Sequence, residues 1–101
     1  MAITDFASSP EFEWDPVKAA LNLRKHKVPF LMACEVFKDD GRLERPDASS
    51  DDEERWVVLG SVDQTILFVV YTQQGQRIRL ISARRATRHE QQRYWTGEIP
   101  A

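Results

Sequence analysis

The sequence has 101 residues, of which 42% are hydrophobic and 30% are charged, and its formal net charge is −2. This size and balance predict one globular domain with a modest core and exclude a disordered chain. The single cysteine, Cys34, excludes an intrachain disulfide and a cysteine-based zinc site, and it suits a reducing cytoplasm.

Residues 1–10 mix small and polar types and are expected to form a flexible leader, followed by one domain over 11–96 and a tail over 97–101. The first residues lack the charged start and apolar run of a signal peptide, and no apolar run is long enough to span a bilayer. We therefore expect a cytoplasmic protein with no membrane partner.

The first part of the domain is expected to contain a short strand and two helices. Residues 11–14 alternate between polar and apolar types, which predicts the strand. Asp15 and Pro16 are typical of an N-cap and a first helical position, so a helix should run to about His26. A second short helix follows Pro29. The residues that fix the helix faces are Val17, Ala20 and Leu21 on a predicted apolar stripe, Lys18, Asn22, Lys25 and His26 on the opposite side, and Phe30, Ala33, Cys34 and Phe37 in helix two.

The second part of the domain is expected to be mostly strand. Residues 38–54 are acidic and rich in turn formers, which predicts a loop with room for one short strand. Three apolar runs, at 55–60, 65–72 and 77–82, are separated by joints of hairpin length, so they predict a three-stranded antiparallel meander. Thr87 and Glu90 form a capping box that opens a short last helix to about Trp95. The fold class is therefore α+β.

Charge is strongly segregated along the chain. Residues 39–54 carry eight carboxylates against two arginines, a net charge of −6, whereas residues 55–101 carry seven arginines against three carboxylates, a net charge of +4. Five of these arginines fall within residues 77–88. The guanidinium group is always charged and its planar fork matches phosphate geometry, so this segment favours a phosphate-bearing partner, in particular RNA.

Two groups of residues resemble the signature of the BrnT family of toxins. The first is Phe12-Glu13-Trp14-Asp15-Pro16-Val17-Lys18, continued by Asn22, Lys25-His26 and Val28-Pro29-Phe30. The second is Arg79-Leu80-Ile81-Ser82-Ala83-Arg84 with Ala86, Glu90 and Tyr94, and Glu54-Arg55-Trp56 before a strand also resembles the family pattern. The likeness spans about residues 12–95. One departure is Lys27, where the family usually has glycine.

The resemblance implies a RelE-like fold and the toxin of a bacterial type II toxin–antitoxin pair. It implies an endoribonuclease that binds and cleaves RNA without a metal or other cofactor and so inhibits translation. It also implies neutralisation by a BrnA-like ribbon-helix-helix antitoxin, with a toxin homodimer inside a toxin–antitoxin heterotetramer.

Metal-free RNA cleavage needs a proton acceptor near the 2′-hydroxyl, a donor near the leaving 5′-oxygen, and cations for the charge that grows on the phosphoryl oxygens. The candidate catalytic residues are Arg79 and Arg84 as phosphate clamps, Arg55 as a third cation, and His26 as an acid or base. The candidate RNA contacts are Lys18, Lys25, Arg77 and Arg88. Arg77 and Arg79 lie on one face of their strand because side chains alternate.

The sequence leaves other interpretations open. The arginines could be paired with carboxylates of residues 39–54 or with an acidic antitoxin, and His26 could satisfy the last turn of its helix. Arg88 also fits ordinary surface charge. Two histidines on separate elements do not identify an acid–base pair, and nothing predicts a metal site. The alternative function is a non-catalytic, arginine-rich binding module for an acidic protein or a nucleic acid.

Overall fold

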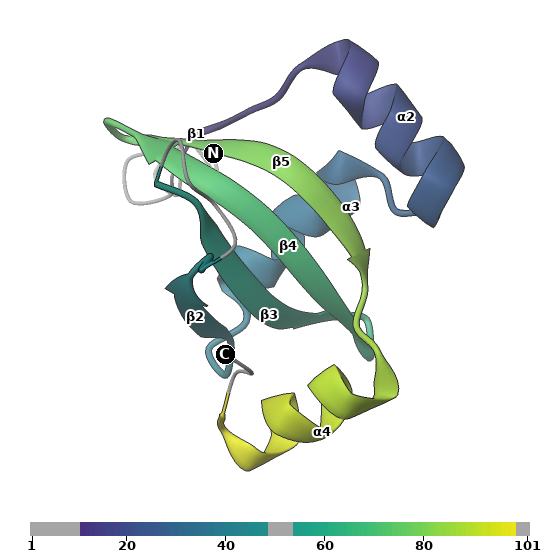
Figure 1. Ribbon diagram of the computed structural model, residues 1–101, viewed down its shortest axis with the longest axis vertical. Coiled ribbons are helices and arrows are strands. Elements are labelled where there is room, and N and C mark those ends of the chain that lie inside the picture. The colour runs from purple at the N-terminus through teal and green to yellow at the C-terminus, as the bar shows by residue number, and fades with distance from the viewer. Residues whose placement is uncertain (1–10, 49–53, 99–101) are drawn as a thin grey trace, which may run out of the picture.

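The computed structural model describes residues 11–48 and 54–98, which form one curved sheet with helices on both sides (Figure 1). None of the helices in these residues is long and apolar enough to cross a membrane. The predicted leader, residues 1–10, and residues 99–101 of the predicted tail lie outside the described residues. In chain order the elements are β1 (Glu11–Glu13), α2 (Pro16–His26), α3 (Phe30–Ala33), the 3-10 helix η1 (Cys34–Lys38), β2 (Leu43–Pro46), β3 (Trp56–Val62), β4 (Thr65–Gln74), β5 (Arg77–Arg85) and α4 (Arg88–Thr96).

The sheet has five strands in the order β1-β5-β4-β3-β2. The antiparallel meander of β3, β4 and β5 confirms the prediction, and both of its hairpins turn over two residues. The sheet is larger than the predicted meander, however, because the short strand expected near residues 11–14 and a short strand within 38–54 both join it. β1 adds a parallel edge beside β5, and β2 adds an antiparallel edge beside β3. The prediction also ended the last strand at residue 82, whereas β5 continues to Arg85.

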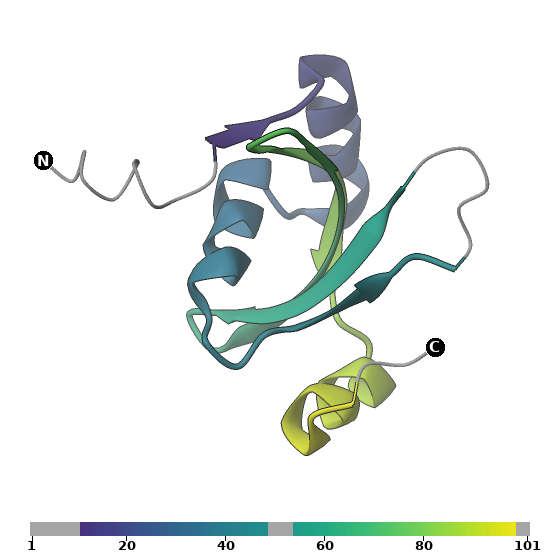
Figure 2. The same cartoon turned by 90° about the vertical axis from the view of Figure 1, so that its left-hand side faces the viewer.

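The main core lies inside the curve of the sheet, where α3 and η1 pack (Figure 2). β3 approaches η1 so closely that a Cβ atom on Gly60 would lie 2.7 Å from the Cβ atom of Val36. Only glycine therefore fits at this crossing without a shift of η1. The buried residues of this core are Val28, Phe30, Ala33, Val36, Val58, Val62, Leu67, Val69, Tyr71, Ile78, Leu80 and Ala83.

Helix α2 begins as predicted but shows a different face to the sheet. Asp15 Oδ1 accepts a hydrogen bond from the Val17 N–H at 2.8 Å, and Pro16 occupies the first turn. The predicted apolar stripe was wrong, because Val17 is 68% exposed and Leu21 is 56% exposed. Asn22, expected on the solvent side, is buried, and Ala19 packs against the core.

The reason for this orientation is the uncovered edge of β5. β1 pairs only with Arg77–Arg79, so the backbone groups of β5 beyond that point need another partner. The Asn22 carboxamide supplies it, since its Nδ2 donates to the Ala83 carbonyl at 2.8 Å and its Oδ1 accepts from the Ala83 N–H at 3.1 Å. The same Nδ2 also donates to the Val28 carbonyl at 3.2 Å. Hydrogen bonding, rather than apolar burial, therefore sets the rotation of α2.

Helix α4 packs against the opposite face of the sheet, where Leu59, Ile66, Ala86 and Tyr94 form a second, smaller core. The Tyr94 hydroxyl donates to Asp39 Oδ2 at 2.5 Å, and the same carboxylate accepts from the Ser61 and Gly41 N–H groups. Burial and the bond to Asp39 raise the pKa of Tyr94 to about 12. This carboxylate thus joins α4 to the sheet and to the turn before β2.

Lys27 ends α2 in the left-handed conformation, with φ 62° and ψ 23°, and its N–H donates to the Leu23 carbonyl. This is the helix-ending position at which glycine is preferred, because a Cβ atom is strained there. We predict that Lys27→Gly raises the free energy of unfolding by about 0.5–1 kcal/mol, the steric gain less the backbone entropy of glycine. Chemical denaturation measures this. Lys27→Ala is the control, since alanine keeps the strain; equal stabilisation by alanine would show that the lysine charge matters instead.

Candidate phosphate-binding site

The face of β5 that carries the arginines is determined by an irregularity at Ile81. Leu80 pairs with Tyr71 and Ser82 pairs with Val70, so Ile81 is an extra residue without a partner on β4. Such a bulge shifts the alternation of side chains by one residue. Arg84 therefore lies on the same face as Arg77 and Arg79, whereas an uninterrupted strand would place it on the opposite one.

On this face a cavity of about 210 Å³ lies where the start of α2 meets the sheet. Three cationic side chains line it from three parts of the chain: Lys18 on α2, Arg55 just before β3, and Arg79 on β5. The remaining lining residues are Asp15, Thr72, Gln74, Leu80 and Ile81. Three positive side chains outnumber the one carboxylate, Asp15, among the described residues around this small hollow, so the site favours an anion.

A second hollow of about 260 Å³ continues from the first along α2. It is lined by Lys25 and His26 from the last turn of the helix, and it shares Lys18 and Ile81 with the cavity. The other lining residues are Leu21, Asn22 and Ser82. The two hollows adjoin at Lys18 and Ile81, and we call them together the cationic groove, since lysine or arginine side chains line both.

Glu13 on β1 holds two of the arginines in place. Its Oε2 atom accepts from Arg79 at 2.8 Å and its Oε1 atom accepts from Arg77 at 3.1 Å. The hydrogen bonds from Arg79 and Arg77 keep the pKa of Glu13 below its ordinary value. Two guanidinium charges against one carboxylate leave a net charge of +1, so the pairing fixes Arg79 beside the cavity without neutralising this cluster.

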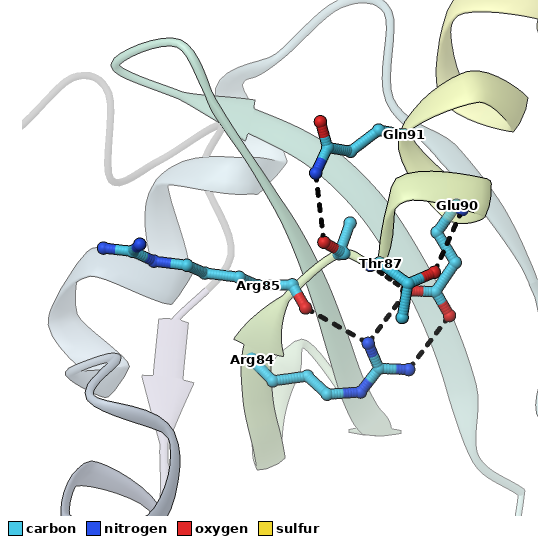
Figure 3. A network of polar contacts seen from close by, with 6 residues as sticks. Arg84, Arg85, Thr87, Glu90 and Gln91 are labelled. Atoms are coloured by element: carbon cyan, nitrogen blue, oxygen red, sulfur yellow. Dashed lines mark hydrogen bonds and ion pairs between the residues drawn. The ribbon is translucent and has the colours of Figure 1, made fainter.

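Arg84 is held by a different carboxylate. Its two terminal nitrogens donate to the two oxygens of Glu90 at 2.8 and 2.9 Å, and its guanidinium carbon lies 4.0 Å from the centre of the Phe68 ring. Figure 3 shows this pair at the start of α4, where Glu90 Oε1 also accepts from the Thr87 N–H in the predicted capping box. Arg84 therefore joins β5 to α4 and does not line the cavity.

The Arg84–Glu90 pair makes a prediction about acid stability. Burial alone would raise the pKa of Glu90, but the hydrogen bonds from Arg84 and Thr87 lower it overall. A lowered pKa stabilises the folded protein above the unfolded pKa of glutamate, about 4.3, and this contribution is lost as the pH falls through the folded value. We expect Glu90→Gln to be less stable than wild type at pH 7, with the difference shrinking below about pH 4.3 in thermal unfolding. A difference that is independent of pH would contradict this assignment.

The sequence-predicted residues divide into four groups in space. Arg55, Arg79 and Lys18 meet at the cavity, and Lys25 and His26 line the adjoining hollow. Arg77 shares the carboxylate of Glu13 with Arg79. Arg84 is bound to Glu90 of α4, and the exposed Arg88 is the first residue of that helix. Among the described residues, the carboxylate partners of Arg77, Arg79 and Arg84 are Glu13 of β1 and Glu90 of α4 rather than acids of the segment before β3.

Sequence reasoning missed two acidic residues of the site. Glu13 was taken only as part of a strand, and Asp15 only as a helix cap. The alternation of the first strand would have placed Glu11 and Glu13 on one face, but the parallel pairing with β5 that brings Glu13 to the arginines has no local signal. Within residues 11–48 and 54–98, no three His, Cys, Asp or Glu side chains cluster in a way that could hold a metal ion.

Comparison with known proteins identifies the family. The model of a family described as the ribonuclease toxin BrnT of type II toxin–antitoxin systems matches residues 14–90. No curated protein matches the chain. The matched residues include α2, the whole β3–β4–β5 meander and Glu90, and thus nearly all of the cationic groove. The chain therefore belongs to the BrnT family of ribonuclease toxins of type II toxin–antitoxin systems.

Proposed function

We propose that this protein is a metal-independent endoribonuclease that cleaves RNA in the cytoplasm and thereby inhibits translation. The observation that carries the proposal is the convergence of Lys18, Arg55 and Arg79 on one cavity. A phosphodiester in this cavity would meet three positive charges in a partly enclosed place, where their attraction is stronger than on an open surface.

In this mechanism the RNA's own 2′-hydroxyl attacks the adjacent phosphorus, and the bond to the 5′-oxygen breaks. Negative charge grows on the phosphoryl oxygens in the transition state. Arg55 and Arg79 stabilise it, and Arg79 is already held in position by Glu13. Lys18 stands where the two hollows meet, so it contacts the same phosphate or its neighbour. Lys25 and His26 bind the RNA strand as it continues along α2. Arg84 lies outside the cavity and holds β5 to α4 through Glu90.

The family membership implies an antitoxin partner. We propose that it is a small ribbon-helix-helix protein, that two copies of this chain join two of it in a heterotetramer, and that the fold is RelE-like. An antitoxin that covers the groove should present acidic side chains to Lys18 and Lys25, because a cation that becomes buried without a partner is costly.

The test is incubation of the purified protein with structured RNA in the presence of EDTA. The expected result is cleavage that leaves 2′,3′-cyclic phosphate and 5′-hydroxyl ends, since the attacking group belongs to the RNA. The same RNA with 2′-deoxy nucleotides should bind and stay intact. Binding without cleavage of ordinary RNA would replace this proposal with an arginine-rich module that binds nucleic acid. Neither binding nor cleavage would leave only a module that binds an acidic protein.

A further inference from the structure

The cationic cavity contains a group that the proposed reaction needs and that arginine cannot supply. The 2′-hydroxyl must lose its proton to attack phosphorus, and a guanidinium that is always protonated accepts no proton. Among the described residues that line the cavity, Asp15 is the only carboxylate. It therefore lies in the same hollow as Lys18, Arg55 and Arg79, where the phosphate is proposed to bind.

The position of Asp15 is fixed by its role at the start of α2. Its Oδ1 atom accepts from the Val17 N–H at 2.8 Å and makes a longer contact of 3.5 Å with the Lys18 N–H. Its Oδ2 atom has no hydrogen-bond partner within residues 11–48 and 54–98. One oxygen thus anchors the side chain and the other remains available as a proton acceptor.

The other candidate bases fit the task less well. Each oxygen of Glu13 accepts a hydrogen bond from an arginine, Oε1 from Arg77 and Oε2 from Arg79, and these bonds lower the pKa of Glu13 and make it a weaker base. His26 lines the adjoining hollow rather than the cavity. The Thr72 hydroxyl donates a hydrogen bond to the Glu54 carbonyl at 2.7 Å, and a hydroxyl is a poor base.

We propose that Asp15 is the general base of RNA cleavage, an inference that rests on the function proposed above. The carboxylate takes the proton of the 2′-hydroxyl as the 2′-oxygen bonds to phosphorus, and the phosphorus–5′-oxygen bond breaks with its electron pair going to that oxygen. The 5′-oxygen takes a proton from water, and the resulting hydroxide takes the proton from Asp15. The carboxylate is restored, and the products are a cyclic phosphate and a 5′-hydroxyl.

The substitution Asp15→Asn separates this role from helix capping, because asparagine caps a helix as well as aspartate does but accepts no proton. We expect kcat to fall about 10²–10⁴-fold, the usual contribution of a positioned base, while KM and the thermal midpoint stay close to wild type. The other charged groups that line the cavity are Lys18 on α2, Arg55 before β3 and Arg79 on β5, and this variant keeps all three.

Asp15→Ser is the second variant, since serine also caps but carries no carboxylate. It should be as inactive as Asp15→Asn and should bind 2′-deoxy-substituted RNA at least as well as wild type, because one negative charge is gone. Wild-type kcat in either variant, with the wild-type enzyme active, would overturn the role of Asp15 and leave the proposed function intact. An inactive wild-type enzyme would overturn the proposed function and this inference with it.

Discussion

Replacing Arg79 with alanine should lower kcat/KM for RNA about 10²–10³-fold, or roughly 3–4 kcal/mol of transition-state stabilisation. Arg79 lines the cavity and is held there by Glu13 at 2.8 Å, so its charge is already in position when the phosphate becomes more negative. Because the interaction strengthens in the transition state, the loss should appear mainly in kcat. Single-turnover cleavage in EDTA measures it.

Arg77 provides a matched control for this experiment. It is the same residue type, on the same strand and bound to the same carboxylate, but it does not line the cavity. Arg77→Ala should therefore reduce cleavage at most a few-fold, through weaker long-range attraction of RNA. Arg93→Ala on α4, whose partner is Glu98, should leave cleavage unchanged. Equal losses from Arg77→Ala and Arg79→Ala would mean that overall charge, rather than the cavity, drives the activity.

Replacing Asn22 with alanine should lower the free energy of unfolding by about 3 kcal/mol or more. The N–H and carbonyl of Ala83 would both lose their partner, and each unsatisfied buried polar group costs about 1–3 kcal/mol. Asn22 is only 7% exposed, so α2 leaves little room for water to replace the amide. Urea denaturation followed by circular dichroism gives the value.

The matched control is Leu21→Ala on the same helix. The sequence pattern placed Leu21 on the buried stripe, where its truncation would cost about 2–5 kcal/mol. In the structure Leu21 is largely exposed, so we expect a change within about 0.5 kcal/mol. A larger loss from Leu21→Ala than from Asn22→Ala would show that the apolar stripe, and not the amide, faces the sheet.

The features that sequence predicted correctly depend on neighbours along the chain. Asp15 and Pro16 start α2, and Thr87 with Glu90 starts α4, because a cap satisfies backbone groups only two or three residues away. The two hairpins were also evident, since their turns join adjacent strands. The clustering of arginines was read directly from the sequence, and the likeness to the BrnT family gave the identity.

Only the tertiary structure decided how these pieces form a site. The bulge at Ile81 moves Arg84 onto the face of Arg79, and the parallel edge strand brings Glu13 to the same arginines. The hydrogen bonds of Asn22 orient α2 so that Lys18 lines the cavity and Leu21 faces solvent. Sequence by itself determined where helices and hairpins begin, because those signals act over a few residues. The partners of β5 and the residues that share a cavity were fixed by contacts between segments far apart in the sequence. Such contacts produce no local sequence pattern that could be recognised.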